Sequence, residues 1–403
     1  MQRLPKEIHA MKQVYRMLLL FMSLVMFVVP SLAEEVLVPE LDNLKSFSPP
    51  DSPALAFVRN LGAGWNLGNT FDAYNDSLIG NELTLERYWC GIKTSREMIA
   101  AVRDAGFRSI RIPTSWHNHV DADFRISDAW MDRVQEVVDW CMEEGFYVIL
   151  NTHHDVGEAY YYPDSAHAET SERYLTAVWS QIAERFRDYD EHLILESFNE
   201  PRLKDTDVEW WLNPLDARCV DSAKEISRLN QIFVQTVRAA GGKNAERYLM
   251  LPGYDASPDG ALSPYYVLPE DSAQDRLIVS VHAYTPYDFA LNLKGPGSFS
   301  VTRRADQNAV TSFMDKLYRH FVAKGIPVVI GEYGALDKKN LQDRVDFFAW
   351  YVANASARSM PCLVWDNNAF TGNGELFGFL KRQTLTWPFP EIIKAIQTYA
   401  LQP

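Results

Sequence analysis

Short apolar runs alternate along the chain with longer segments in which apolar residues recur every three or four positions. The runs are mostly apolar and rich in β-branched residues, which is typical of strands buried on both faces of a parallel sheet. Strand-like runs occur at 62–68, 109–114, 147–152, 193–198, 247–251, 277–284, 326–332 and 360–365.

The segments between most of these runs have the spacing of amphipathic helices. Clear examples lie at 96–105, 129–144, 172–188, 222–240 and 341–357. Several helical segments end in a glycine shortly before the next strand, where a left-handed conformation costs little. These glycines are Gly106, Gly145, Gly241 and Gly325. The helix expected within 255–276 is poorly defined.

Strands that alternate with helices in this way predict an α/β protein with one closed (β/α)8 TIM barrel. An open doubly wound sheet is the main alternative, and it usually carries a glycine-rich phosphate loop after its first strand. The segment from Gly62 to Gly68 resembles such a loop only weakly, because no helix begins after it.

The N-terminus has the features of a secretory signal peptide. Lys12 and Arg16 precede the apolar run 17–29, and small residues end at Ala33. A membrane anchor is the alternative, but a span needs about 20 apolar residues. We therefore expect a secreted or periplasmic protein with no membrane attachment after cleavage. The expected parts are a signal peptide at 1–33, an N-terminal leader or linker at 34–52 and the barrel domain at 53–403.

Composition and charge narrow the range of partners. Hydrophobic residues make up 47% of the chain and charged residues 23%, which is ordinary for a globular protein with a large core. The net charge is −14. Such a surface repels nucleic acid and anionic lipid headgroups. We expect a monomer that acts on a neutral substrate and binds neither nucleic acid nor membrane.

Polar side chains follow most of the predicted strands. In a TIM barrel the active site lies at the C-terminal ends of the strands, so these side chains should meet there. They include arginine, imidazole, amide, carboxyl and aromatic groups. The candidates are Asn66, Arg111, Trp116, His153, His154, Asn199, Glu200, His282, Tyr284, Glu332 and Trp365.

Glu200 and Glu332 are the central pair among these candidates. A single glutamate at a strand end is more often a solvated residue or a salt-bridge partner. Two glutamates that end separate barrel strands, with Arg111 and amide groups nearby, suit the breaking of a glycosidic bond. That reaction needs one carboxylic acid to protonate the leaving oxygen and one carboxylate to attack or to activate water.

Metal chemistry is the main alternative for the histidine cluster. His153 and His154 are followed by Asp155, a combination that can bind a metal. No H-E-x-x-H motif and no C-x-x-C pair is present. We therefore predict that these residues bind sugar or the carboxyl groups, and that the protein uses no metal and no cofactor. The four cysteines are either disulfide-bonded, in one of three pairings, or free thiols.

The eleven tryptophans divide into two groups by position. Trp130, Trp140, Trp179 and Trp350 lie in helical patterns and are expected in the core. Trp116, Trp210, Trp211 and Trp365 follow strands 2, 4 and 8 and are candidates for stacking on sugar rings. Together with Tyr287 they would line an open groove suited to internal cleavage of a polysaccharide.

The chain also resembles glycoside hydrolase family 5, and most closely its endoglucanase and xyloglucanase branch. The resemblance runs from about Leu61 to Trp387. The motifs that carry it are GWNLGNTFDA at 64–73, IRIPTSW at 110–116, VILNTHHD at 148–155, ESFNEPR at 196–202, VHAYTPYDFA at 281–290, VVIGEYGA at 328–335 and LVWDNN at 363–368.

The resemblance implies a retaining enzyme with Glu200 as acid/base and Glu332 as nucleophile. It further implies that Arg111 and Tyr284 hold Glu332 ionised, that Asn199 binds a sugar hydroxyl, and that Trp365 carries the ring being cleaved. His153 and His282 would position sugar and carboxyls. We expect Arg111 to keep Glu332 ionised and Glu200 to have a raised pKa. No role is assigned to His117 or His119.

The substrate stays open at this point. The resemblance implies an endo-β-1,4-glucanase that hydrolyses β-glucan, with xyloglucan or mixed-linkage glucan as further substrates. A β-mannanase or xylanase of the same family is the alternative. A non-catalytic carbohydrate-binding barrel would lack one of the two carboxyls, and a metal-dependent hydrolase would be inactivated by a chelator.

Overall fold

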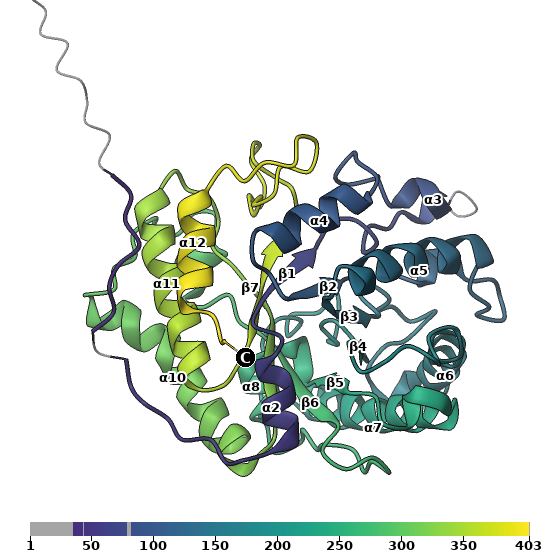
Figure 1. Ribbon diagram of the computed structural model, residues 1–403. Helices are drawn as coiled ribbons and strands as arrows, with labels where there is room; N and C mark the ends of the chain where they lie inside the picture. The colour runs from purple at the N-terminus through teal and green to yellow at the C-terminus, as the bar shows by residue number, and fades with distance from the viewer. Residues whose placement is uncertain (1–34, 43, 79–81, 403) are drawn as a thin grey trace, which may run out of the picture. The chain divides into compact units, whose positions relative to one another are not determined.

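Eight parallel strands form a closed barrel in a computed structural model that describes residues 35–42, 44–78 and 82–402 (Figure 1). The strands pair in chain order, and β8 pairs with β1. Each predicted strand is confirmed, with ends that differ by a few residues. The strands are β1 (Ala63–Leu67), β2 (Ser109–Ile112), β3 (Tyr147–Asn151), β4 (Leu193–Glu196), β5 (Leu249–Pro252), β6 (Leu277–His282), β7 (Val328–Tyr333) and β8 (Cys362–Asp366).

Helices surround these strands, as Figure 1 shows. The predicted helices are confirmed in place, and α11 has the predicted bounds. The long helices are α4 (Arg96–Asp104), α5 (Asp128–Glu143), α6 (Ala168–Arg185), α7 (Ala217–Ala239), α10 (Arg304–His320), α11 (Leu341–Ala357) and α12 (Pro390–Tyr399).

The segment between β5 and β6, where the sequence predicted a poorly defined helix, contains only short helical turns. These are the 3₁₀ turn η5 (Tyr254–Ala256) and α8 (Pro258–Ala261). The other short elements are α3 (Glu82–Leu85), α9 (Tyr287–Ala290), η1 (Asp76–Leu78), η2 (His117–His119), η3 (Ser165–His167), η4 (Gly242–Ala245) and η6 (Val322–Lys324).

One short helix closes the N-terminal end of the barrel. Helix α2 (Pro53–Arg59) is capped by the Ser52 hydroxyl, and its apolar face packs on residues from the strands. Phe57 stacks on Tyr248 with ring centroids 3.6 Å apart. This apolar contact closes the N-terminal end of the barrel, so the polar strand ends on the opposite side are left to form a site.

The leader contacts the domain through its described residues. Leu37 donates a backbone hydrogen bond to Gln342, and Phe47 packs on Tyr318 of α10 at 4.5 Å. The predicted signal peptide at 1–33 lies outside the described residues, and the boundaries of the leader stay a prediction.

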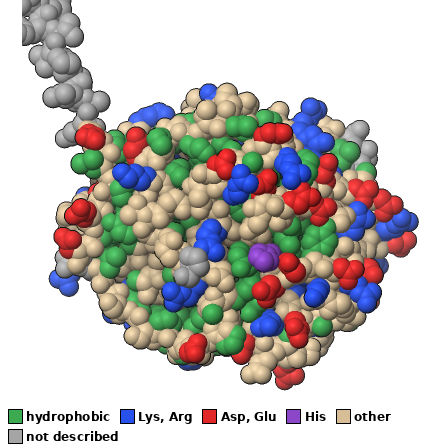
Figure 2. Space-filling view, viewed as in Figure 1, with side chains coloured by type: hydrophobic (Ala, Val, Ile, Leu, Met, Phe, Trp, Pro, Cys, Tyr) green, Lys and Arg blue, Asp and Glu red, His purple; other side chains and the backbone are tan. Residues whose placement is uncertain are grey.

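Charged and apolar side chains are interspersed over the face shown in Figure 2. All four cysteines fall in the described ranges, and all are free thiols. Cys141, Cys219 and Cys362 are buried, whereas Cys90 is partly exposed. Of the two alternatives that the sequence left open, the structure therefore has the free thiols.

Within the described residues, no helix combines the length and the apolar character needed to cross a membrane.

The glycines at the helix ends have the left-handed backbone that their positions predict. Their φ angles are 93° at Gly106, 80° at Gly145, 68° at Gly241 and 86° at Gly325. At Gly145 an added Cβ would meet no atom within 4 Å, so only the backbone conformation requires glycine there.

We predict that Gly145→Ala lowers the free energy of unfolding by about 1 kcal/mol, because alanine is strained at this φ. Urea unfolding would measure the change. Gly374→Ala is the matched control, since its Cβ also meets nothing within 4 Å and its φ is not in the left-handed region. Equal losses in both variants would contradict the backbone explanation.

Candidate active site

The two predicted carboxyl groups meet at the C-terminal end of the barrel. Glu332 lies in β7, and Glu200 follows β4. One oxygen of each carboxyl and one ring nitrogen of His282 all lie within 4.8 Å of one another. Pro201 disfavours helical backbone at Glu200, because its ring would clash with the preceding residue.

An irregular strand pairing accompanies this meeting. The register of β6 with β7 shifts between Val281 and His282, and that of β7 with β8 shifts between Ile330 and Tyr333. Such irregularities re-aim side chains at barrel rims. Here His282 becomes the partner of Glu332 across the two strands. Sequence reasoning did not find these shifts.

Arg111 connects most of the site. Its side chain is fully buried in β2, and its Nη1 donates to Oε1 of Glu332 at 2.6 Å. Its Nη2 donates to Oδ1 of Asn199 at 2.9 Å, so the amide NH2 group of Asn199 is the end left to donate. Its Nε donates to Glu196 at 2.7 Å. One cation therefore holds the proposed nucleophile and orients the amide beside Glu200.

Glu196 is an active-site residue that sequence reasoning missed. It is fully buried in β4 and accepts hydrogen bonds from Arg111, from the Ser280 hydroxyl at 2.6 Å and from Asn151 at 3.1 Å. A carboxylate at the end of the apolar run LILE was the available signal, since a buried acid needs a partner. Glu196 balances the charge of Arg111.

The other neighbours of Glu332 come from β6, β8 and the segment after β6. The Tyr284 hydroxyl donates to Oε2 of Glu332 at 2.9 Å. Nδ1 of His282 lies 2.8 Å from Glu200 and 3.7 Å from Glu332. Trp365 belongs to an apolar cluster against which Tyr284 packs, and its ring lies parallel to the His153 ring at 5.9 Å. The structure thus brings together most of the predicted set.

The pKa of Glu200 is shifted in the direction opposite to the one that the sequence predicts. Burial raises the pKa of Glu332, although His282 and Arg111 act to lower it. Burial also acts to raise the pKa of Glu200, but the hydrogen bond and charge of His282 prevail and lower it. Burial opposes a charge on His282, yet Glu332 and Glu200 together raise its pKa.

The raised pKa expected for Glu200 was therefore wrong, whereas the ionised state expected for Glu332 stays a prediction. The reason is that His282 contacts both carboxyls, which sequence spacing does not reveal. Nδ1 of His282 lies 2.8 Å from the Glu200 carboxyl, close enough for a proton to pass between the two groups. The three groups behave as one set that shares a proton.

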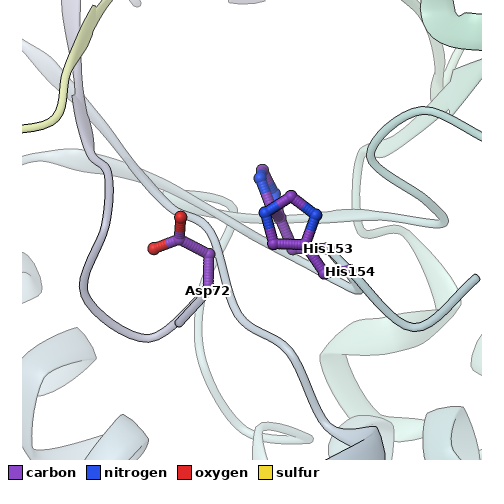
Figure 3. A group of neighbouring side chains, drawn as sticks. All are labelled: Asp72, His153 and His154. Atoms are coloured by element: carbon purple, nitrogen blue, oxygen red, sulfur yellow. The ribbon is translucent and has the colours of Figure 1, made fainter. Parts of the chain in front are cut away.

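Two adjacent imidazoles from the end of β3 face a third carboxyl. Figure 3 shows Asp72 beside His153 and His154, and one carboxylate oxygen of Asp72 and one ring nitrogen of each histidine lie within 4.8 Å of one another. Burial raises the pKa of Asp72 to about 7 and lowers that of His154 to about 3, while the pKa of His153 is also well below its usual value because of burial. Both imidazoles are thus neutral at pH 7.

Two sets of described residues have a geometry that is able to hold a metal ion. One is this cluster, and the other consists of Glu200, His282 and Glu332. In the first set, the Asp72 oxygens already accept the backbone N–H groups of Asn69 and Thr70. Nδ1 of His153 lies 3.2 Å from the Asn151 amide. The absence of a metal and of a cofactor stays a prediction.

Two predicted substrate contacts need correction. Trp116 is fully buried, and its Nε1 donates to the Asn151 carbonyl at 2.9 Å, so its ring has no face for a sugar. Asn66 is also fully buried, and its amide bonds to Arg111 and to backbone carbonyls. Both residues support the site from beneath, because the chain folds over them.

The two tryptophans after β4 and the two histidines of η2 differ in exposure. Trp210 and Trp211 are exposed, as a stacking role requires. His117 lies 3.2 Å from Asp155, whereas His119 is buried flat against Trp130 at 3.6 Å. These contacts are structural and add no role in the chemistry.

Residues 68–371 match the cellulase family, glycosyl hydrolase family 5. The chain belongs to this family. It is 44% identical to Endoglucanase 1 of Ruminococcus albus over 346 residues, which cover 85% of this chain and 80% of that protein. It is 38% identical to Endoglucanase B of Neocallimastix patriciarum over 349 residues, with 84% and 70% covered.

Solved structures of cellulase-family proteins are similar throughout the barrel. A lichenase from Caldicellulosiruptor sp. F32 shares 50% identity with a TM-score of 0.87, covering 90% of this chain and 99% of that one. A broad specificity endoglucanase from Ruminococcus champanellensis with bound cellotriose shares 40% identity with a TM-score of 0.81, covering 87% and 100%. The resemblance read from the sequence motifs and the predicted fold are confirmed.

We predict that Tyr284→Phe lowers kcat by about 10- to 100-fold, because a hydrogen bond to a charged group contributes about 1.5–3 kcal/mol. Initial rates at saturating substrate would measure it. Tyr351→Phe is the control, since that buried hydroxyl donates to the Ala283 carbonyl at 2.8 Å and touches neither glutamate. Equal kcat losses would contradict a specific action of Tyr284 on Glu332.

Proposed function

We propose that this protein is a secreted, retaining endo-β-1,4-glucanase with Glu332 as nucleophile and Glu200 as acid/base. The observation that carries the proposal is the closeness of the two carboxyl groups. Oxygens of the two groups lie within 4.8 Å. Retaining glycosidases have carboxyls about 5–5.5 Å apart, whereas inverting enzymes need about 6.5–9.5 Å to admit a water molecule.

In the first step, a Glu332 oxygen attacks the anomeric carbon while Glu200 protonates the leaving oxygen. Arg111 and Tyr284 each hold one oxygen of Glu332, which keeps the carboxylate in place for attack. Protonated His282, whose Nδ1 lies 2.8 Å from Glu200, supplies the proton to Glu200 and is left as a neutral imidazole. The NH2 group of Asn199 is placed to bind a hydroxyl of the sugar that becomes attached.

In the second step, water replaces the enzyme on the anomeric carbon. Forming the glycosyl ester removes the charge of Glu332, which lay 3.7 Å from His282. Glu200 then accepts a proton from the attacking water and so acts as the base. The second displacement restores the original anomeric configuration.

The substrate assignment draws on the relatives and on the aromatic residues. The similar proteins are named as endoglucanases and a lichenase, and one of the similar structures contains cellotriose. The proposal includes Trp365, which is 8% exposed, as the residue that stacks on the sugar held at Glu332. We extend the proposal to xyloglucan and mixed-linkage glucan. Secretion rests on the signal sequence, with cleavage after Ala33, and a monomeric state is part of the same proposal.

Glu332→Gln should abolish turnover of every glycoside, because no glycosyl-enzyme is able to form. Glu200→Gln should lose far less activity on aryl glycosides with good leaving groups than on cello-oligosaccharides, because such groups need little protonation. Steady-state kinetics on both substrate types would measure this difference. Equal losses on both types in Glu200→Gln would refute the acid role.

We predict internal cleavage with retention of configuration. Viscosity of carboxymethyl cellulose or xyloglucan should collapse before much reducing sugar appears, because an endo enzyme shortens chains after few cuts. Proton NMR should show the β-anomer as the first product. Reducing sugar that accumulates while viscosity holds would instead show an exo enzyme, and a first-formed α-anomer would show inversion. Matched assays on mannan and xylan test the alternative substrates.

A further inference from the structure

Arg202 stands two residues after the proposed acid and is not used in the mechanism above. Only 7% of its surface is exposed. Its Nη1 donates to the backbone carbonyl of Glu200 at 2.9 Å, and its Nε donates to Glu209 at 3.0 Å. Its guanidinium lies over the Trp210 ring at 4.0 Å. One buried cation therefore joins the acid-bearing segment to a tryptophan.

Trp210 belongs to a group of exposed aromatic side chains beside the acid. Trp210 is 48% exposed, Trp211 is 67% exposed and Tyr287 is 50% exposed. Trp211 and Tyr287 are in edge contact with centroids 6.1 Å apart, although they come from the segments after β4 and β6. Since Arg202 covers one face of Trp210, the exposed part of the ring is on the other side. We call these three side chains the aromatic platform.

The position of the acid indicates which part of a substrate the platform meets. Glu200 protonates the oxygen that leaves, so the departing sugar lies on the Glu200 side. The sugar that is retained becomes attached to Glu332. Arg202 contacts both the Glu200 backbone and the Trp210 ring, which puts Trp210 on the Glu200 side of the site.

We propose that Arg202 is a positioning residue that couples Glu200 to the aromatic platform, and that the platform binds the departing part of the glucan chain. This inference rests on the proposed function. It assigns the platform to pyranose rings on the leaving-group side. Arg202 then has two effects: it sets the orientation of Trp210, and it supplies positive charge beside the acid.

The charges around Arg202 support this coupling. Its acidic neighbours are Glu200, Glu209 and Asp255, and it also acts on His153, His154 and Tyr161. Asp255 has a buried oxygen without a hydrogen-bond partner, and its backbone N–H donates to Pro201 at 2.8 Å. Alongside His282, Arg202 lowers the pKa of Glu200 against the effect of burial.

The first test compares Arg202→Met with Arg202→Lys in the full chain. Removing a cation favours the protonated form of every nearby group, so both limbs of the kcat/KM profile should move to higher pH by about half a unit or more in Arg202→Met. Arg202→Lys keeps the charge and should restore the wild-type profile. It should still raise KM for cellotetraose, because lysine lacks the planar group that stacks on Trp210.

The second test removes the platform itself. Trp211→Ala should raise KM for cello-oligosaccharides by about fivefold or more, through lost stacking. It should affect aryl cellobiosides much less, because their leaving group is not a sugar. Trp387→Ala is the matched control: Trp387 packs on Phe107 before the start of β2, at the opposite end of the barrel. It should leave both substrates unchanged.

The outcomes separate the two proposals. A wild-type protein that cleaves no glucan would overturn the proposed function itself. An active wild type with an unshifted pH profile in Arg202→Met would overturn the coupling. Equal KM changes for oligosaccharides and aryl cellobiosides in Trp211→Ala would overturn the leaving-group assignment. Thermal melts of each variant show whether a loss comes from unfolding, and the ratio between the two substrates is independent of the folded fraction.

Discussion

The guanidinium of Arg111 is a fully buried cation, and its burial is tolerable only because two carboxylates and two amides surround it. A buried charge without partners would cost several kcal/mol. Glu196 provides one compensating charge and Glu332 the other. The proposed nucleophile is thus also a structural partner, and the electrostatics that hold the barrel end together are those that hold the reacting group.

This arrangement depends on how the barrel is built. The apolar face of α2 closes the N-terminal end, so water reaches the polar strand ends from one side. Strong burial then acts on every titratable group at the site. It favours neutral His153 and His154 and raises the pKa of Glu332, and only direct partners counter it. Electrostatic interactions are stronger in such an environment than in water, so a single hydrogen bond is able to decide where a proton resides.

His282 shows the consequence. Glu332 and Glu200 raise the pKa of His282, and His282 in turn lowers the pKa of Glu200. The protonation of the acid is therefore linked to that of the imidazole 2.8 Å away. On the other side of Glu200, Arg202 adds a second cation and extends the same network to Trp210. Acid strength and substrate binding are in this way linked through contacts of a few ångströms.

The sequence by itself determined the strands, the helices, the barrel and the strand ends at which Glu200 and Glu332 stand. These follow from local rules: apolar periodicity sets the elements, glycines such as Gly145 end helices, and parallel strands bring their C-terminal ends to one side. Only the tertiary structure decided which side chains face the site and which are covered. Asn66 lies in β1 and Trp116 follows β2, and both are fully buried, whereas Trp365 in β8 is 8% exposed. Glu196 looked like part of an apolar run and became the counterion of Arg111. The pKa directions also belong to the tertiary structure, because a pKa depends on burial and on charges within a few ångströms, and residues such as Glu200 and His282 that are 82 positions apart supply them.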